Sequence, residues 1–157
     1  MEKNMNRIFE NMYASRELQS MLFSSVCEKY NITHAEMLVL LFLYRNKSSD
    51  TATDIVERLK IAKSHVSASV RDLEERGYIT GSYAGHDRRT IHLELCEKSN
   101  EIIRAGERAQ AEFVSVICRG FSDDELNTLK NYIQRMTGNI NEYLDDHNYK
   151  KGGNHDQ

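Results

Sequence analysis

The stretch from Lys63 to Leu95, KSHVSASVRDLEERGYITGSYAGHDRRTIHLEL, changes its hydrophobic period part-way along. In its first half, Val66, Val70 and Leu73 are spaced four and three residues apart, which places them on one face of a helix. Gly77 follows at a position where helices often end in a left-handed residue. The spacing therefore predicts an amphipathic helix that ends just before this glycine.

The second half of the stretch has the pattern of two β-strands. Apolar residues at positions 91, 93 and 95 alternate with polar ones, and positions 78–83 are rich in β-forming residues. Between them lies AGHDRR, residues 84–89, which ends in two arginines. The pattern predicts a β-hairpin with a basic tip.

The face of the predicted helix opposite its apolar side carries small polar side chains and a cation. A helix that enters the major groove of DNA needs small residues for close approach and polar tips that can bond to base edges. Taken alone, this helix is better explained as an ordinary solvated amphipathic helix. The basic hairpin after it favours a helix-turn-helix with a wing. The candidate DNA contacts of the helix are Lys63, Ser64, His65, Ser67, Ala68 and Arg71.

The predicted hairpin tip carries Asp87, Arg88 and Arg89. Arginine is attracted into a narrow minor groove, where the negative potential of DNA is enhanced. The carboxylate of Asp87, two residues before Arg89, could hold that guanidinium in one orientation. The alternative interpretation is an ordinary exposed turn.

Two shorter helices are predicted before this stretch. Thr33-His34-Ala35-Glu36 has the form of a capping box and precedes an apolar run that extends to Tyr44. Thr51-Ala52-Thr53-Asp54 is a second candidate cap, before a short helix that carries Ile55, Val56 and Leu59. The first of these helices is expected to be buried.

The two ends of the chain predict long helices. One helix is expected from about residue 4 to residue 29, and Ser122-Asp123-Asp124-Glu125 forms another candidate capping box. After that box, apolar residues recur every three or four positions, which is the pattern of a coiled-coil seam. We expect this seam to bind a second copy of the chain, with purely intramolecular packing as the alternative. Its residues are Leu126, Leu129, Ile133, Met136, Ile140 and Tyr143.

A further apolar stripe precedes this seam. It is expected on a helix that joins the DNA-reading part of the chain to the dimerisation part. Its residues are Ile102, Ala109, Phe113, Val116 and Phe121.

Composition limits the class of protein. The chain has 157 residues, 39% of them hydrophobic and 29% charged, which is typical of a folded globular protein. The longest apolar run, residues 37–44, is far shorter than the roughly 20 residues that cross a bilayer. Three widely spaced cysteines do not form a disulfide framework. We therefore expect a cytoplasmic protein with reduced thiols and no contact with membranes.

Charge is unevenly distributed along the chain. The formal net charge is −3, but residues 60–89 hold six Lys or Arg against four Asp or Glu. A locally basic segment in an acidic protein suits a DNA reader, because phosphate contacts are local.

The order and spacing of these motifs resemble the multiple antibiotic resistance regulator (MarR) family. The resemblance rests on DIVERL at 54–59, KSHVS at 63–67, DLEERGYI at 72–79 and the Asp-Arg-Arg of the wing, and it covers roughly residues 33–99. It implies a mainly α fold with a small β-hairpin wing. It also implies a triangular homodimer on double-stranded DNA, with the recognition helices in successive major grooves and the wings in the flanking minor grooves.

The resemblance also implies a domain organisation and contact residues. Residues 1–149 would form one domain, with the winged helix-turn-helix at about 33–96, dimerisation helices at about 4–29 and 97–146, and a disordered tail at 150–157. Within the motifs, Ser64, Ser67, Ala68 and Arg71 would contact DNA, Asp87 would anchor Arg89, and Arg88 would contact a phosphate.

This chain departs from the family pattern at three positions. Ala62 stands where a helix-capping serine is frequent, and His65 replaces a common small hydroxyl residue. Cys96 stands where a capping threonine usually precedes Glu97. These departures leave the base preference of the protein open.

Family members often respond to small ligands, many of them phenolic, that bind between the dimerisation and winged parts. By position, Met12, Tyr13, Arg16 and His34 are the candidate walls of such a pocket, although each is also consistent with an ordinary core or surface residue.

Redox sensing is the alternative signal to a small ligand. It would use one of Cys27, Cys96 and Cys118, and Cys27 is the one in a helix comparable to that of thiol-sensing relatives. The spacing of His86, His92 and Cys96 matches no standard metal site.

Two other functional classes remain to be compared with DNA binding. A winged helix can serve as a protein-binding module, which would not need Arg89. An enzyme would need a convergent set of nucleophile, base and charge stabiliser, and no such motif or cofactor-binding signature is present in the sequence. We therefore expect a regulator without a cofactor, not an enzyme.

Overall fold

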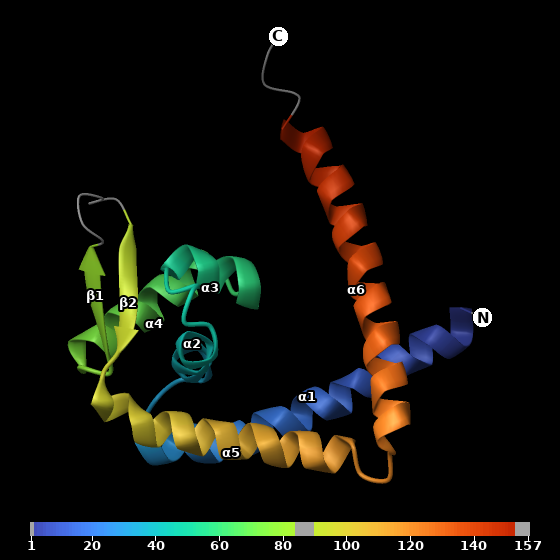
Figure 1. Ribbon diagram of the computed structural model, residues 1–157, viewed down its shortest axis with the longest axis horizontal. Coiled ribbons are helices and arrows are strands. Elements are labelled where there is room, and N and C mark those ends of the chain that lie inside the picture. Colours follow the sequence, from blue (N-terminus) through green and yellow to red (C-terminus); the bar gives the residue numbers. More distant parts are fainter. Residues whose placement is uncertain (1, 84–89, 153–157) are drawn as a thin grey trace. The chain divides into compact units, whose positions relative to one another are not determined.

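The computed structural model describes residues 2–83 and 90–152, with side chains described for residues 13–83 and 90–147. The chain is mainly helical with a two-stranded antiparallel hairpin, which confirms the predicted fold class. Its elements are α1 (Glu2–Tyr30), α2 (His34–Arg45), α3 (Ala52–Leu59), α4 (Lys63–Glu75), β1 (Ile79–Tyr83), β2 (Ile91–Leu95), a 3-10 turn (Glu97–Ser99), α5 (Asn100–Ile117) and α6 (Asp123–Gly152) (Figure 1).

The chain divides into two compact units, residues 1–117 and residues 118–157. The first contains the winged helix with α1 and α5, and the second contains α6. No helix among the described residues combines the length and apolar character needed to cross a bilayer.

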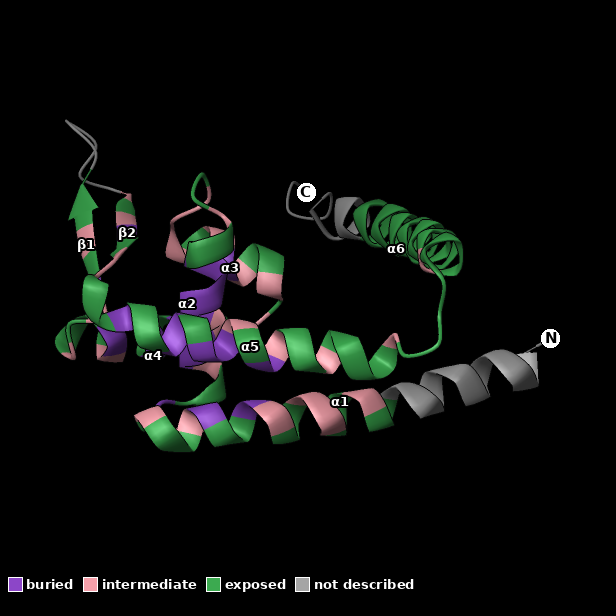
Figure 2. Cartoon of the chain, turned by 60° about the horizontal axis from the view of Figure 1, so that its bottom comes forward, coloured by how far each residue is buried: buried purple, intermediate pink, exposed green. Residues whose placement is uncertain are grey.

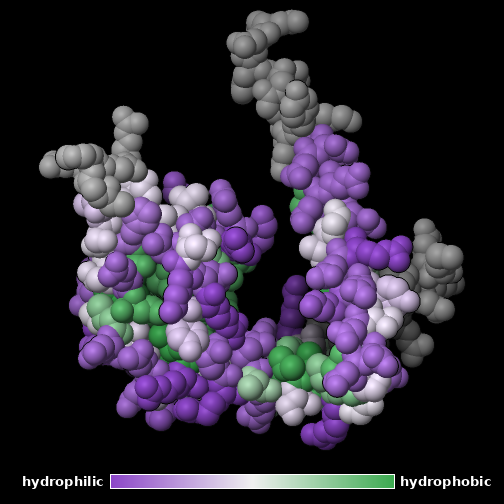
Figure 3. Space-filling view, viewed as in Figure 1, coloured by the Kyte–Doolittle hydropathy of each residue, from purple (hydrophilic) through white to green (hydrophobic). Residues whose placement is uncertain are grey.

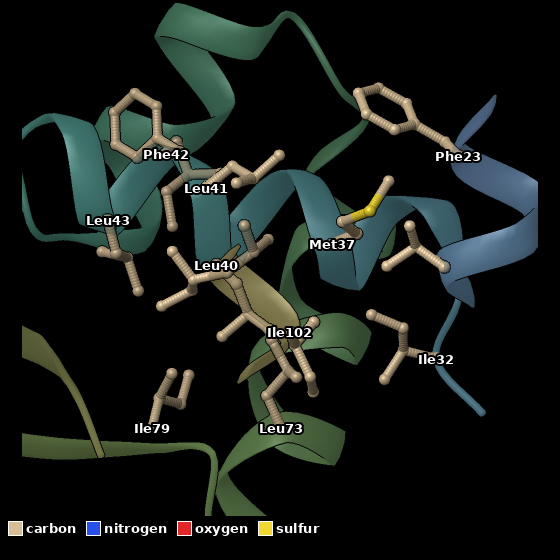
Figure 4. Close-up of a cluster of buried hydrophobic side chains, with 14 of the residues drawn as sticks. Phe23, Ile32, Met37, Leu40, Leu41, Phe42, Leu43, Leu73, Ile79 and Ile102 are labelled. Carbon is tan, nitrogen blue, oxygen red and sulfur yellow. The ribbon is translucent and has the colours of Figure 1, made fainter. Parts of the chain in front are cut away.

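Helix α2 lies at the centre of the first unit, as its apolar sequence predicts. Met37, Val39 and Leu40 are fully buried, and α2 contacts α1, α4, α5 and β2. Figure 2 shows buried residues concentrated on α2, and Figure 4 shows its side chains meeting Leu73 and Ile102 from neighbouring helices. This core supports every element that carries the candidate site.

Capping side chains mark the starts of α2 and α3 where the sequence predicts them. Thr33 and Glu36 form a complete capping box, and so do Thr51 and Asp54. Helix α4 has no such device, because Ala62 offers no side-chain acceptor. It ends before Gly77, whose φ of +72° is the left-handed conformation predicted there.

The hairpin pairs β1 with β2 in register, with Ile79 opposite Leu95 and Tyr83 opposite Ile91. Thr51, at the start of α3, adds an isolated antiparallel bridge to His92 on β2. The hairpin is thus joined by backbone contacts to the segment between α2 and α3.

Helices α1 and α5 pack along each other, and α5 also contacts α2. The backbone of α5 comes close to α2 at Gly106, where a built Cβ would lie 3.2 Å from both δ-carbons of Leu41. Ile102 and Ala109, from the predicted stripe of α5, are buried in this packing.

The rest of that stripe differs from the prediction. Phe113 is half-buried, whereas Val116 is 40% exposed. Phe121 was expected on the same helix but lies outside it, because α5 ends at Ile117 and Gly120 takes a φ of +87°. The region expected at about 97–146 is therefore two helices separated by a turn.

Helix α6 begins with the predicted capping box, in which Ser122 and Glu125 exchange backbone-to-side-chain hydrogen bonds. It extends to Gly152, three residues into the segment expected to be a disordered tail. In the single chain, Leu126 of its apolar seam is half-buried, whereas the other five seam residues are exposed, from 40% for Met136 to 62% for Tyr143 (Figure 2).

Candidate nucleic-acid interface

Helix α4 separates its side chains into a buried and an exposed face, as its spacing predicts. Val66 and Leu73 are at most 1% exposed, and Ser69, which the sequence analysis did not single out, is also buried. The opposite face is open to solvent. It carries all six candidate DNA contacts, Lys63, Ser64, His65, Ser67, Ala68 and Arg71.

The cations on this face are free to bind an external anion. Lys63 and Arg71 form no hydrogen bond or ion pair with any residue of the described part of the chain. Small side chains at positions 64, 67 and 68 leave the helix backbone approachable. The face thus combines a narrow helical profile with unpaired positive charge.

A groove lies on either side of this face. One is a cavity of about 170 Å³ between α3 and α4, lined in part by Thr53, Lys63 and Ser67. The other, of about 410 Å³, lies between the start of α2 and α4 and includes Arg71 and Glu75. Thr53 was missed by the sequence analysis because its proximity to Ser67 depends on the angle between two helices.

Arg76 links the C-terminal end of α4 to α1 and α2. Its guanidinium donates to Asp72 at 3.1 Å and to the carbonyl oxygen of Tyr30 at 3.3 Å, and lies 3.9 Å from a carboxylate oxygen of Glu36. It also lies 5.0 Å from the centre of the Tyr78 ring. These contacts hold the C-terminal end of α4 in place relative to α1 and α2.

Glu36 is nearly fully buried beside this arginine, with 4% exposure. Burial first, and then its hydrogen bond to Asp72, raise the pKa of the Glu36 carboxyl, against the opposing effect of Thr33. The pKa of Asp72 is lowered by its hydrogen bonds to Glu36 and then to Arg76. The hydrogen bond between the two carboxyls thus shifts their pKa values in opposite directions.

The predicted wing contacts Asp87, Arg88 and Arg89 lie outside the described residues. The strands that lead to them are described. Tyr83 at the end of β1 and Ile91 at the start of β2 are 56% and 46% exposed.

The four candidate effector contacts are not gathered around one of the cavities described here. Tyr13 is 69% exposed and Arg16 is exposed, while the side chain of Met12 lies outside the described residues. The ring of His34 lies 5.4 Å from that of Phe23, and burial lowers its pKa. Their role in binding an effector stays a prediction.

The environment of Cys27 does not favour redox sensing. Burial, followed by the nearby charges of Glu36 and Glu28, raises the pKa of this thiol. A raised pKa decreases the fraction of reactive thiolate at neutral pH.

Comparison with known proteins agrees with this geometry. The family model described as MarR family matches residues 30–90, which run from the last residue of α1 through α2, α3, α4 and β1 and end just before β2. This part of the chain is similar to the MarR family. Among curated proteins, it is 24% identical to the HTH-type transcriptional regulator BilQ of Clostridioides difficile (strain CD3) over 111 residues, 68% of this chain and 74% of BilQ.

Solved structures of DNA-binding regulators share the fold over 83% to 96% of this chain. A regulator from Listeria monocytogenes, crystallised with a 26mer DNA, has a TM-score of 0.78 at 22% identity, covering 96% of this chain and 97% of its own. A regulator from Methanosarcina mazei Go1 has a TM-score of 0.72 at 19% identity, covering 87% and 90%. BpsR of Bordetella bronchiseptica has a TM-score of 0.66 at 16% identity, covering 83% and 98%.

Proposed function

We propose that this chain is a MarR family transcriptional regulator that binds a pseudo-palindromic DNA operator as a homodimer. The observation that carries the proposal is the exposed face of α4, where small side chains alternate with Lys63 and Arg71, which have no partner among the described residues. Its relatives support the proposal, since BilQ is named a transcriptional regulator and the Listeria protein was crystallised with DNA.

In the proposed complex, α4 lies in the major groove. Ser64, Ser67 and Ala68 approach base edges, while Lys63, His65 and Arg71 bind phosphates or guanine. Asp87, Arg88 and Arg89 of the wing are proposed to reach the minor groove, where arginine is attracted by the narrow channel of A·T-rich DNA.

The second copy is proposed to cover the apolar seam of α6. An exposed seam of this length on one helix is typical of an oligomer interface, and a two-fold dimer presents two copies of α4 to the duplex. The half-sites of the operator are then expected about 34 Å apart, one turn of DNA.

We further propose that a small aromatic effector controls DNA binding, so that the protein acts as a ligand-responsive repressor in the cytoplasm. The DNA binding of its structural relative BpsR is regulated by 6-hydroxynicotinic acid. Met12, Tyr13, Arg16 and His34 remain the proposed contacts. The raised pKa of Cys27 favours a ligand over a thiol as the signal.

The test is selection of bound sequences from random DNA by the purified protein, followed by affinity measurements on the selected operator. R71A is expected to weaken binding about tenfold or more, because a good base or phosphate contact contributes roughly 1–3 kcal/mol. R89A should also lower the slope of log affinity against log salt by about one. R104A, which removes an exposed arginine from α5, is the matched control and should bind like the wild type.

If neither R71A nor R89A changes affinity at any salt concentration, the proposed interface is wrong. Selection of no sequence at low salt would instead favour a winged helix that binds proteins.

A further inference from the structure

The hairpin is held from outside along both of its edges. Gly81 of β1 and Leu93 of β2 face each other in the ladder, yet both amide groups bond to partners outside the hairpin. The amide of Leu93 donates to the carbonyl oxygen of Asp50 at 2.8 Å, and the amide of Gly81 donates to Oε1 of Glu74 at 3.0 Å. They form a non-hydrogen-bonded pair of the ladder, whose amides point outward.

The β2 edge is anchored to the start of α3. Besides accepting from Leu93 through its backbone, Asp50 places Oδ1 at 2.7 Å from Nδ1 of His92. The next residue, Thr51, bridges to His92 and caps α3 together with Asp54. Several contacts therefore fix this edge.

The β1 edge has a different anchor, the single carboxylate of Glu74 on α4. The contact depends on Gly81, because a Cβ built there would lie 2.8 Å from Oε1 of Glu74 and 2.9 Å from Cγ2 of Ile91. Any larger residue at position 81 must displace the carboxylate. The hydrogen bond between Glu74 and Gly81 therefore requires both the carboxylate at position 74 and the glycine at position 81.

We propose that Glu74 is a positioning residue that sets the angle between the hairpin and the recognition helix α4. This rests on the proposed function, in which helix and hairpin meet different grooves of one duplex. An isolated two-stranded hairpin is only marginally stable and can change its twist. A hydrogen bond from α4 to the β1 edge decreases the conformational freedom of the hairpin before DNA binds. Less conformational entropy is then lost on binding.

The effect of losing the Glu74 hydrogen bond can be separated from the effect of losing a negative charge near DNA. A carboxylate close to DNA repels phosphates, so removal of an acidic residue from α4 should by itself strengthen binding. Glu75, exposed on the same turn, forms no hydrogen bond or ion pair with the described residues. It therefore provides a control that has the charge of Glu74 without its bond.

The first measurement is affinity for the selected operator. E74A is expected to bind about three- to tenfold more weakly, the effect of losing one hydrogen bond, while E75A binds as well as the wild type or better. E74Q keeps the acceptor oxygen and should stay within about twofold of the wild type. The double variant E74A/G81A should bind no more weakly than the weaker single variant, because each change removes the same bond.

The second measurement is hydrogen exchange at the Gly81 amide without DNA. E74A is expected to accelerate exchange at Gly81, whereas E75A leaves it unchanged. Equal affinities of E74A and E75A, or unchanged exchange at Gly81 in E74A, would overturn the positioning role. Failure of the wild type to bind any DNA would overturn the proposed function instead, and the exchange result would then decide by itself whether Glu74 holds the hairpin.

Discussion

The two units of this chain treat their apolar side chains in opposite ways. In residues 1–117, α2 buries Met37, Val39 and Leu40 completely, and its neighbours complete the core. In residues 118–157, α6 has a capping box at its start and an apolar seam along its length, but most of the seam residues are about half exposed. The first unit thus builds a hydrophobic core within the single chain, whereas the apolar residues of α6 would be covered by the second copy in the proposed dimer.

This difference separates two sources of stability. Burial inside the first unit contributes at any protein concentration. Burial of the α6 seam contributes only when a second copy is bound, so its contribution depends on concentration.

The largest effect is expected from placing charges on the α6 seam. I133D/I140D should increase the dimer dissociation constant at least a thousandfold, because two carboxylates would be buried without partners in the dimer interface. Sedimentation equilibrium measures the constant. N131D, which adds a carboxylate to the opposite face of α6, is the matched control. A double variant that remains dimeric at the concentration of the wild type would place the interface elsewhere.

The second prediction compares a leucine-to-alanine substitution in each of the two units. L40A should lower the free energy of unfolding by about 3 kcal/mol at every protein concentration. L129A should cost less than about 1 kcal/mol when the protein is dilute and monomeric, and more as dimer forms. Urea denaturation over a range of concentrations distinguishes them. If L129A were equally costly at all concentrations, α6 would be buried within its own chain.

A smaller effect is expected at the helix starts of the first unit. T51A removes the cap of α3 and should cost about 1 kcal/mol. A62S adds the missing acceptor at the start of α4, where φ is −57° and ψ is 136°, and should raise stability by about 0.5–1 kcal/mol. Thermal unfolding measures both. A destabilised A62S would show that this backbone does not accept a serine cap.

The smallest effect is a pH dependence within the first unit. Because the pKa of Glu36 is raised, its contribution to stability is fully present below pH 4.5, the ordinary value, and is lost as pH rises through the raised pKa. E36Q keeps a donor and an acceptor without ionising. Its stability relative to the wild type should therefore increase with pH, by at most about 1.4 kcal/mol per pH unit.

Urea denaturation between pH 4 and 8 measures this difference. E75Q, at an exposed carboxylate of α4, is the control. Parallel stability curves for E36Q and the wild type would show that Glu36 ionises as readily in the folded as in the unfolded chain.

The features that could be predicted from sequence are those set by neighbours within one or two helical turns. The Thr33 to Glu36 and Thr51 to Asp54 caps join residues three positions apart, and both are confirmed. The exposed face of α4 follows from the spacing of its apolar residues. Such patterns need no knowledge of the rest of the fold.

The features that sequence reasoning missed depend on tertiary packing. Arg76 bonds to Tyr30, which is 46 positions away. The position of Phe121 depends on where α5 ends, which the apolar spacing alone does not show, although the predicted capping box at Ser122 marks the start of the next helix. The bond between Glu74 and Gly81 requires the turn at Gly77 to bring β1 back along α4.

The close approach of α5 to α2 at Gly106 also affects how a movement of α5 would reach the rest of the first unit. The Leu41 side chain packs directly on the backbone of α5 at Gly106, so no second side chain lies between the two helices at this point. A displacement of α5 toward α2 at this point would therefore meet the Leu41 side chain directly. Because α2 also contacts α4, this packing connects α5 to the helix-turn-helix through α2.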